Sequence, residues 1–293
     1  MTGAKLHEGT LLVVGTGYVG LRCLSQKATG HRVGLSRSPV TAPVPVVIYD
    51  LDSAETLPIT LPDQYNILYT VPPATTSAED LRLERLLAAL LPLPESFVYI
   101  STTGVYGDCG GAEVDEQRQP NPGTARAQRR VAAERQLLSW SDANAVRLCI
   151  LRVPGIYGPG RLGTDRIRAG MPNIRESEAN PGNRIHVDDL VTCCEAALSG
   201  KTCSGIFNVG DGDHHSSTWF AREIARQCGL PPAPEISREE AVQQLSAQRR
   251  SFLGESRRIN TRKMREVLGV TPRYANPVDG IHASLVEQGS ISD

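Results

Sequence analysis

Three glycines near the N-terminus constrain the fold of this chain more than any other feature. Gly15, Gly17 and Gly20 form the pattern Gly-x-Gly-x-x-Gly directly after residues 10–14, an apolar, β-branched run typical of a buried strand. In a strand–turn–helix unit the first glycine permits a tight turn, the second lets the backbone approach a diphosphate, and the third lets the helix pack closely on the strand. The motif therefore predicts a dinucleotide site, the alternative being a purely structural turn. The expected contacts come from Gly15, Thr16, Gly17, Tyr18, Val19 and Gly20.

Strand and helix patterns alternate through the first half of the chain. Helical spacing marks residues 18–29, 79–91 and 124–140. Apolar runs typical of buried parallel strands occupy residues 31–35, 44–50, 65–71, 96–101 and 145–152. Strands that alternate with helices at this pitch predict an α/β fold with a Rossmann-type, doubly wound parallel sheet.

The pattern becomes irregular after residue 153, which we take as the end of the dinucleotide-binding core that begins at residue 1. Residues 154–293 are a mixed region, in which 154–184 and 211–293 form a small C-terminal substrate lobe and 185–210 return to the core. Within it we expect a loop over 155–183, a strand over 206–209, helices over 218–228 and 261–268, and a charged, proline-led connection over 231–250.

Composition excludes several classes of partner. The formal net charge of -1 provides no basic footprint for nucleic acid or for an anionic membrane. No run of 18 apolar residues and no signal-peptide pattern occur, so we expect no membrane partner and a cytoplasmic protein. The 7 cysteines are irregularly spaced without a Cys-x-x-Cys pair, which argues against a disulfide framework or a metal site and for a reducing compartment.

The residues at the end of the second predicted strand bear on the choice of cofactor. An NAD site usually has an acid there to accept from the ribose 2′-hydroxyl, but this chain has Ser36, Arg37 and Ser38 and no acid. An arginine flanked by hydroxyls suits a 2′-phosphate, so we predict NADP, with NAD as the alternative. The simpler interpretation of Arg37 is a solvated loop residue. Asp50 and Leu51 are expected to hold the adenine, with Val71 completing the cofactor contacts.

Several further segments resemble those of one enzyme family. Tyr99-Ile-Ser-Thr102-Thr-Gly-Val-Tyr-Gly107 is similar to the S-S/T-x-x-V-Y-G segment of the extended short-chain dehydrogenase/reductases. The family's L-R-x-x-x-x-Y-G-P, I-H-V-D-D and N-V-G segments are matched in order by residues 151–159, 185–189 and 208–210. The resemblance implies a Rossmann domain with a small C-terminal lobe, a substrate held between them, and an epimerase, dehydratase or reductase activity.

One departure from the family pattern affects the expected chemistry. The family's Tyr-x-x-x-Lys pair is absent, because Arg126 stands at the tyrosine position and Arg130 at the lysine position when the long helix is aligned on Glu134. Arginine cannot exchange a proton near neutral pH. Arg130 could still hold the nicotinamide ribose, whereas Arg126 could clamp a carboxylate or phosphate of a substrate.

The proton donor must then come from elsewhere. Thr102 matches the family's catalytic serine or threonine, Tyr106 follows four residues later, and His186 titrates nearest neutrality. Each also has a structural interpretation: packing at a strand end, packing in the core, or anchoring a loop. The remaining substrate-binding candidates are Tyr157, Arg161 and Arg184.

Three functional hypotheses follow. The first is an NADP(H)-binding oxidoreductase or epimerase-like enzyme that acts on a small polar substrate with a non-standard acid/base. The second is a catalytically inactive NADP(H)-binding sensor or scaffold protein, favoured by the loss of both tyrosine and lysine. The third is a non-redox lyase or isomerase, which no residue specifically supports. A homodimer through residues 79–91 and 124–140 is compatible with the resemblance.

Overall fold

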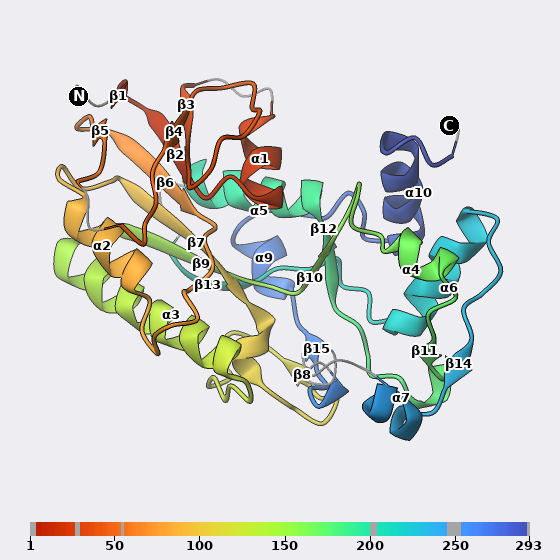
Figure 1. Cartoon of the computed structure of the whole chain (residues 1–293). Coiled ribbons are helices and arrows are strands. Elements are labelled where there is room, and N and C mark those ends of the chain that lie inside the picture. The colour runs from red at the N-terminus through yellow and green to blue at the C-terminus, as the bar shows by residue number, and fades with distance from the viewer. Residues whose placement is uncertain (1–3, 27–29, 54–55, 200–203, 245–252, 292–293) are drawn as a thin grey trace.

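A seven-stranded parallel sheet forms the centre of the molecule (Figure 1). The computed structural model describes residues 4–26, 30–53, 56–199, 204–244 and 253–291. The strand order is β13-β9-β7-β6-β2-β3-β4, and every neighbouring pair is parallel. Their bounds are β2 Thr10–Val14, β3 Arg32–Ser36, β4 Val46–Ile48, β6 Tyr65–Tyr69, β7 Ser96–Thr102, β9 Arg147–Val153 and β13 Gly205–Asn208. The predicted doubly wound α/β fold is confirmed.

Helices cover both faces of this sheet, as parallel strands require. Helices α1 (Tyr18–Leu24), α5 (Val187–Ser199) and α9 (Arg262–Glu266) lie on one face, whereas α2 (Leu81–Ala89) and α3 (Ala125–Asn144) lie on the other (Figure 1). The carboxyl ends of the strands meet at one edge of the sheet, where such folds bind ligands.

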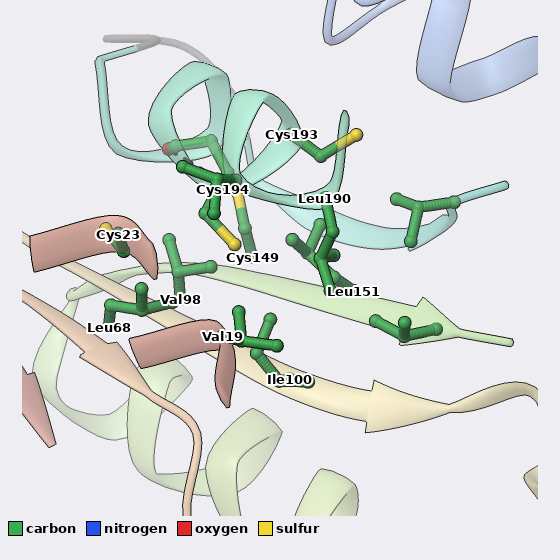
Figure 2. Close-up of a cluster of buried hydrophobic side chains, with 14 of the residues drawn as sticks. Val19, Cys23, Leu68, Val98, Ile100, Cys149, Leu151, Leu190, Cys193 and Cys194 are labelled. Carbon is green, nitrogen blue, oxygen red and sulfur yellow. Dashed lines mark hydrogen bonds between the residues drawn. The ribbon is translucent and has the colours of Figure 1, made fainter. Parts of the chain in front are cut away.

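The core beneath α1 and α5 is rich in cysteine. Cys23, Cys149, Cys193 and Cys194 pack there against Leu68, Val98, Ile100 and Leu151 (Figure 2). All four thiols are buried and form no disulfide among the described residues, and burial raises the pKa of Cys23, Cys193 and Cys194. They act as small apolar side chains.

The first helix ends earlier than its pattern indicates. It was predicted to reach residue 29, but α1 ends at Leu24, and residues 27–29 lie outside the described part of the chain. Arg32 of β3 donates to the Cys23 carbonyl at 2.6 Å and so satisfies an end carbonyl of the helix. This partner comes from the next strand, and the helical pattern contains no sign of it.

The second half of the chain contains more regular structure than predicted. The expected loop over 155–183 holds the short elements β10 (Gly155–Tyr157), α4 (Thr164–Arg168), β11 (Asn173–Ile174) and η2 (Glu176–Glu178). β10 pairs with β12 (Arg184–His186), and β11 pairs with β14 (Glu235–Ile236) inside the expected connection 231–250. These elements are too short to show a period in the sequence.

Helices complete the C-terminal lobe. On the side away from the sheet, α6 (Ser217–Gln227) packs against α10 (Pro277–Glu287) and α4, whereas α7 (Arg238–Gln244) packs against β11 (Figure 1). α10 was not predicted, although its signal is present: Asn276 caps it by accepting from the Val278 amide, and Pro277 occupies the first turn. Within the described ranges, no helix is long and apolar enough to cross a bilayer.

Candidate dinucleotide and substrate site

A pocket of about 330 Å³ lies at the carboxyl ends of β2, β3 and β6. It brings together nine of the predicted cofactor-binding residues: Gly15, Thr16, Gly17, Ser36, Arg37, Ser38, Asp50, Leu51 and Val71. These residues come from four separate segments, and the sheet topology alone places them side by side. The pocket has the size and position expected for the adenosine and diphosphate part of a dinucleotide.

A side chain would have a different steric consequence at each glycine of the loop. Gly15 has a φ of +98°, and an added Cβ would lie 2.6 Å from the Thr70 hydroxyl. A Cβ on Gly20 would lie 2.0 Å from the Gly15 carbonyl oxygen, so α1 can begin this close to the strand only with glycine there. At Gly17 no atom of the described residues lies within 4 Å of the added Cβ. This open space is where a diphosphate could approach the backbone.

Tyr18 and Val19, which stand between Gly17 and Gly20, do not line the pocket. Val19 is buried in the core, whereas the Tyr18 hydroxyl donates to the Pro159 carbonyl at 3.0 Å. The Arg161 guanidinium lies 4.1 Å from the centre of the Tyr18 ring. Burial raises the pKa of Tyr18 to about 12. Tyr18 therefore links the glycine-loop helix to the C-terminal lobe.

A second contact links the same helix to the lobe. Arg22 of α1 donates from Nε to Asp188 of α5 at 2.6 Å and from Nη2 to Glu287 of α10 at 2.8 Å. The helix that starts at the nucleotide site is thus tied to two elements of the second half of the chain. This arrangement fixes the orientation of the lobe relative to the pocket.

The predicted adenosine end of the pocket has a compact backbone turn. The Ser36 hydroxyl donates to the Ser38 carbonyl at 2.6 Å, and the Asp50 carboxylate accepts from the Asp52 amide at 3.0 Å. Arg37 is exposed at the pocket wall. Arg82 of α2 also lines the pocket, although no sequence signal pointed to it, because it lies 45 residues beyond Arg37 in a segment without a nucleotide-binding motif.

The two arginines predicted to stand at the family's tyrosine and lysine positions differ in their surroundings. Arg130 is half-buried, and its Nη1 donates to the Tyr99 hydroxyl at 2.9 Å and to the Ile100 carbonyl at 2.8 Å. Its guanidinium is therefore anchored on β7. Arg126 lies one turn earlier on α3 and is exposed, so a bound molecule can reach it.

Thr102 lies at the end of β7, next to the first turn of α3. Its hydroxyl accepts from the Gly104 amide at 3.2 Å, which leaves the hydroxyl proton to donate elsewhere. The short helix η1 (Thr103–Tyr106) packs on α3 here, since a Cβ on Gly104 would lie 3.9 Å from that of Ala127. Thr102 is half-buried and close in the fold to the turn that carries Arg126.

The other two predicted proton donors lie in structural positions. Tyr106 is fully buried, its hydroxyl donates to Asn208 at 2.7 Å, and burial raises its pKa. His186 is 1% exposed, and its Nδ1 accepts from the Asp188 amide at 3.2 Å. The proton therefore sits on Nε2, which contacts the Ser284 hydroxyl at 3.1 Å. Burial lowers the pKa of His186 to about 4. Burial and these internal hydrogen bonds speak against both as the general acid.

Two of the predicted substrate-binding residues are also internal. Tyr157 is 3% exposed and packs edge-on against the rings of His186 and Phe220. Arg184 is 6% exposed and pairs with Asp213 at 2.5 Å. Both side chains lie in the interior of the lobe and not on its surface. Of the four predicted substrate residues, only Arg126 and Arg161 are exposed.

Asp211 has an unusual environment for a carboxyl group. Asp211 is 2% exposed, its Oδ1 accepts from the Asp213 amide at 2.9 Å, and its Oδ2 has no partner among the residues described. Burial raises the pKa of Asp211 to about 7. In the part of the chain described, no group of three His, Cys, Asp or Glu side chains could hold a metal ion.

This carboxyl predicts a pH-dependent gain in stability for Asp211→Asn. The unfolded carboxyl titrates near about pH 4, so between that pH and about pH 7 the folded protein binds the extra proton. Stability should then fall as pH rises, by about 1 kcal/mol per pH unit, and level off above pH 7. Thermal unfolding from pH 5 to pH 8 should show the variant gaining on the wild type as pH rises. The opposite titration of His186 is common to both proteins and cancels, so parallel pH profiles would contradict the prediction.

Comparison with known proteins agrees with this geometry. Residues 72–210 match the model of the NAD dependent epimerase/dehydratase family. Within this segment the chain is similar to that family. It is 25% identical over 141 residues to dTDP-glucose 4,6-dehydratase of Streptomyces niveus, covering 45% of this chain and 42% of that protein. The chain matches about half the length of the first curated relatives.

Solved structures match over nearly the whole chain. A functionally unknown conserved protein from Silicibacter pomeroyi has a TM-score of 0.78 and 28% identity, covering 95% of this chain and 99% of its own. MoeE5 in complex with UDP-glucose and NAD has a TM-score of 0.75 and 24% identity, with 96% and 98% covered. The second likeness shows a common fold. The chain thus has a Rossmann-type α/β fold, and residues 72–210 are similar to the epimerase/dehydratase family.

Proposed function

We propose that this protein is an NADP(H)-binding enzyme of the oxidoreductase or epimerase-like type that acts on a small polar substrate with a non-standard acid/base. One observation carries the proposal. The pocket at the glycine loop joins an open diphosphate cradle at Gly17 to an adenosine end where Ser36, Arg37 and Ser38 stand in place of the acid. A guanidinium there favours a phosphate over a ribose hydroxyl.

The chemistry follows from the residues that remain near the end of β7. A bound nicotinamide would supply or accept a hydride. The Thr102 hydroxyl has its proton free to donate to the reacting oxygen of the substrate. Arg126 would supply positive charge to an oxyanion that develops there, and solvent would deliver the proton. Arg130, anchored on Tyr99, would position the ribose side of the site.

NAD is the alternative cofactor, because the related MoeE5 structure holds NAD. The local sequence favours NADP, since no carboxylate follows β3 before Pro39. Asp50 lies in the same pocket at the end of the next strand, but it accepts from the Asp52 amide.

A specific observation also favours the second candidate function, a catalytically inactive NADP(H)-binding sensor or scaffold. Arginines occupy both family positions for the acid/base pair, and the hydrogen bonds of Tyr106 and His186 are made within the protein. Tight binding of NADPH without its oxidation across a panel of carbonyl substrates and nucleotide sugars would favour this function. Turnover of any one of them would favour the enzyme.

Titration with NADPH, NADP and NAD tests the shared part of both functions. We expect wild-type NADPH binding to weaken by about 10- to 100-fold in Arg37→Ala, because the 2′-phosphate loses a charge-assisted partner. NADH binding should change by less than about 3-fold. Nicotinamide fluorescence and calorimetry measure both, and Arg168→Ala on exposed α4 serves as a control. An Arg37→Ala protein with unaltered NADPH affinity would contradict the NADP assignment.

A further inference from the structure

Arg82 lies at the adenosine end of the pocket but comes from a segment that carries no nucleotide-binding motif. It is the second residue of α2, and its side chain lines the same pocket as Ser36, Arg37 and Ser38. The side chain is 17% exposed, so its guanidinium is held at the wall of the pocket rather than extended into solvent. A bound adenosine could therefore meet a second cation.

The Arg82 guanidinium is held by a carboxylate at present. Its Nε donates to Asp52 Oδ1 at 2.8 Å, its Nη2 donates to the other Asp52 oxygen, and its Nη1 donates to the Pro72 carbonyl at 3.2 Å. The Asp52 side chain is 43% exposed, and its pKa is lowered, first of all by the hydrogen bond from Arg82. This two-pronged contact is also the geometry in which arginine binds a phosphate.

Three arginines act on this carboxylate. Arg82, Arg37 and Arg85 all interact electrostatically with Asp52. Among the residues described, Arg37 makes no ion pair. Asp50 lines the same end of the pocket, and the buried Asp80 also acts on Arg82. A phosphate monoester, with nearly two negative charges at neutral pH, could take the place of Asp52 between these arginines.

We propose that Arg82 is a second ligand of the cofactor's 2′-phosphate, and that Asp52 holds it in place until the phosphate replaces the carboxylate. The inference rests on the proposed NADP(H)-binding function. The exchange is favourable in hydrogen bonds, because Arg82 keeps two charge-assisted acceptors and the displaced Asp52 is already open to water. Arg37 and Arg82 thus bind the phosphate from two segments of the pocket wall, the turn after β3 and the first turn of α2.

Arg85 provides a matched control on the same helix. Its Nη1 donates to the Leu51 carbonyl at 3.0 Å, but its side chain does not line the pocket. The dissociation constants of NADPH and NADH are measured by calorimetry for the wild type and for Arg82→Gln, Arg85→Gln and Asp52→Asn. The pair 2′,5′-ADP and 5′-AMP isolates the single phosphate. Thermal unfolding verifies that each variant is folded, and Arg82→Lys retains the charge if Arg82→Gln does not fold.

We expect Arg82→Gln to weaken NADPH and 2′,5′-ADP by about 10- to 100-fold while NADH and 5′-AMP change by less than about 3-fold. Arg85→Gln should leave all four within about 3-fold. Asp52→Asn should tighten NADPH or leave it unchanged, since a competing carboxylate is removed. If Arg82→Gln weakens NADPH and NADH binding equally, or weakens neither, the proposed role of Arg82 is overturned. If Asp52→Asn binds NADPH more weakly than the wild type, the proposed role of Asp52 is overturned.

Failure of the proposed function gives a different result. If the wild-type protein binds NADH but not NADPH, the proposal of a 2′-phosphate site is wrong as a whole, including the role of Arg37. A wild-type protein that binds neither would remove the dinucleotide site itself. Both results are obtained before any variant is made, and either one overturns the inference on Arg82 through its premise.

Discussion

Replacing Glu134 by alanine is expected to lower the free energy of unfolding by about 3–5 kcal/mol. Glu134 on α3 and Arg152 on β9 are each 3% exposed, and their closest atoms, Oε2 and Nη2, lie 2.7 Å apart. The Ser101 hydroxyl donates to the same carboxylate at 2.5 Å. Truncation would leave the Arg152 guanidinium buried without its counter-charge, in a site that water cannot enter freely.

Thermal unfolding measures this effect as a fall in Tm of about 10 °C, given the usual scaling for a chain of this size. The control is Arg168→Ala, which removes an ion pair whose side chains are 51% and 99% exposed and should cost less than about 1 kcal/mol. The double variant Glu134→Leu, Arg152→Met should recover much of the loss, because an apolar pair leaves no uncompensated charge. A loss below about 1 kcal/mol for Glu134→Ala would refute the assignment of the pair as a structural link between α3 and the sheet.

Replacing Gly17 by alanine should abolish dinucleotide binding without unfolding the protein. The Gly17 backbone has a φ of -75°, which alanine adopts readily, and within the described part of the chain no atom lies within 4 Å of the added Cβ. Stability should therefore change by less than about 1 kcal/mol. The same methyl group would occupy the space through which a diphosphate approaches the loop, so NADPH affinity should fall by about 100-fold or more.

Gly20→Ala tests the other steric requirement of the same loop. Its Cβ would fall 2.0 Å from the Gly15 carbonyl oxygen, and backbone atoms cannot give way as a flexible side chain can. We expect this variant to lose about 1–3 kcal/mol of stability as well as cofactor binding. Calorimetry measures the NADPH affinity of both variants, and thermal unfolding measures their stability. Together they distinguish a steric block to the ligand from damage to the fold. If Gly17→Ala bound NADPH as tightly as the wild type, the diphosphate would not cross the loop at this point.

The elements with strong local signals were predictable. The glycine spacing predicted the β2–α1 turn, because the tight turn at Gly15 and the close packing at Gly20 act within a few residues of one another. The alternation of apolar strands and amphipathic helices predicted the parallel sheet. The short pairs β10–β12 and β11–β14 were missed, since two or three residues cannot show a period and their partners are distant in the chain.

In the candidate site, too, the residues with a local sequence signal were predicted and the others were missed. Residues 15–17, 36–38 and 50–51 follow directly from strand ends, and they meet in one pocket because parallel strands end at one edge. Arg82 was missed because its place in the pocket depends on how α2 packs on the sheet and on its contact with Asp52. No pattern within α2 indicates either condition.

By itself, the sequence determined the fold class, the position of the candidate nucleotide pocket and the absence of the Tyr-x-x-x-Lys pattern, because each depends on residue identity and local spacing. Only the tertiary structure decided which polar side chains are available for chemistry. His186 and Tyr106 were reasonable proton donors in the sequence, but Ser284 and Asn208, both about 100 residues further along the chain, take up their hydrogen bonds. Burial and partnership are properties of packing between distant segments, so they appear only once the chain is folded.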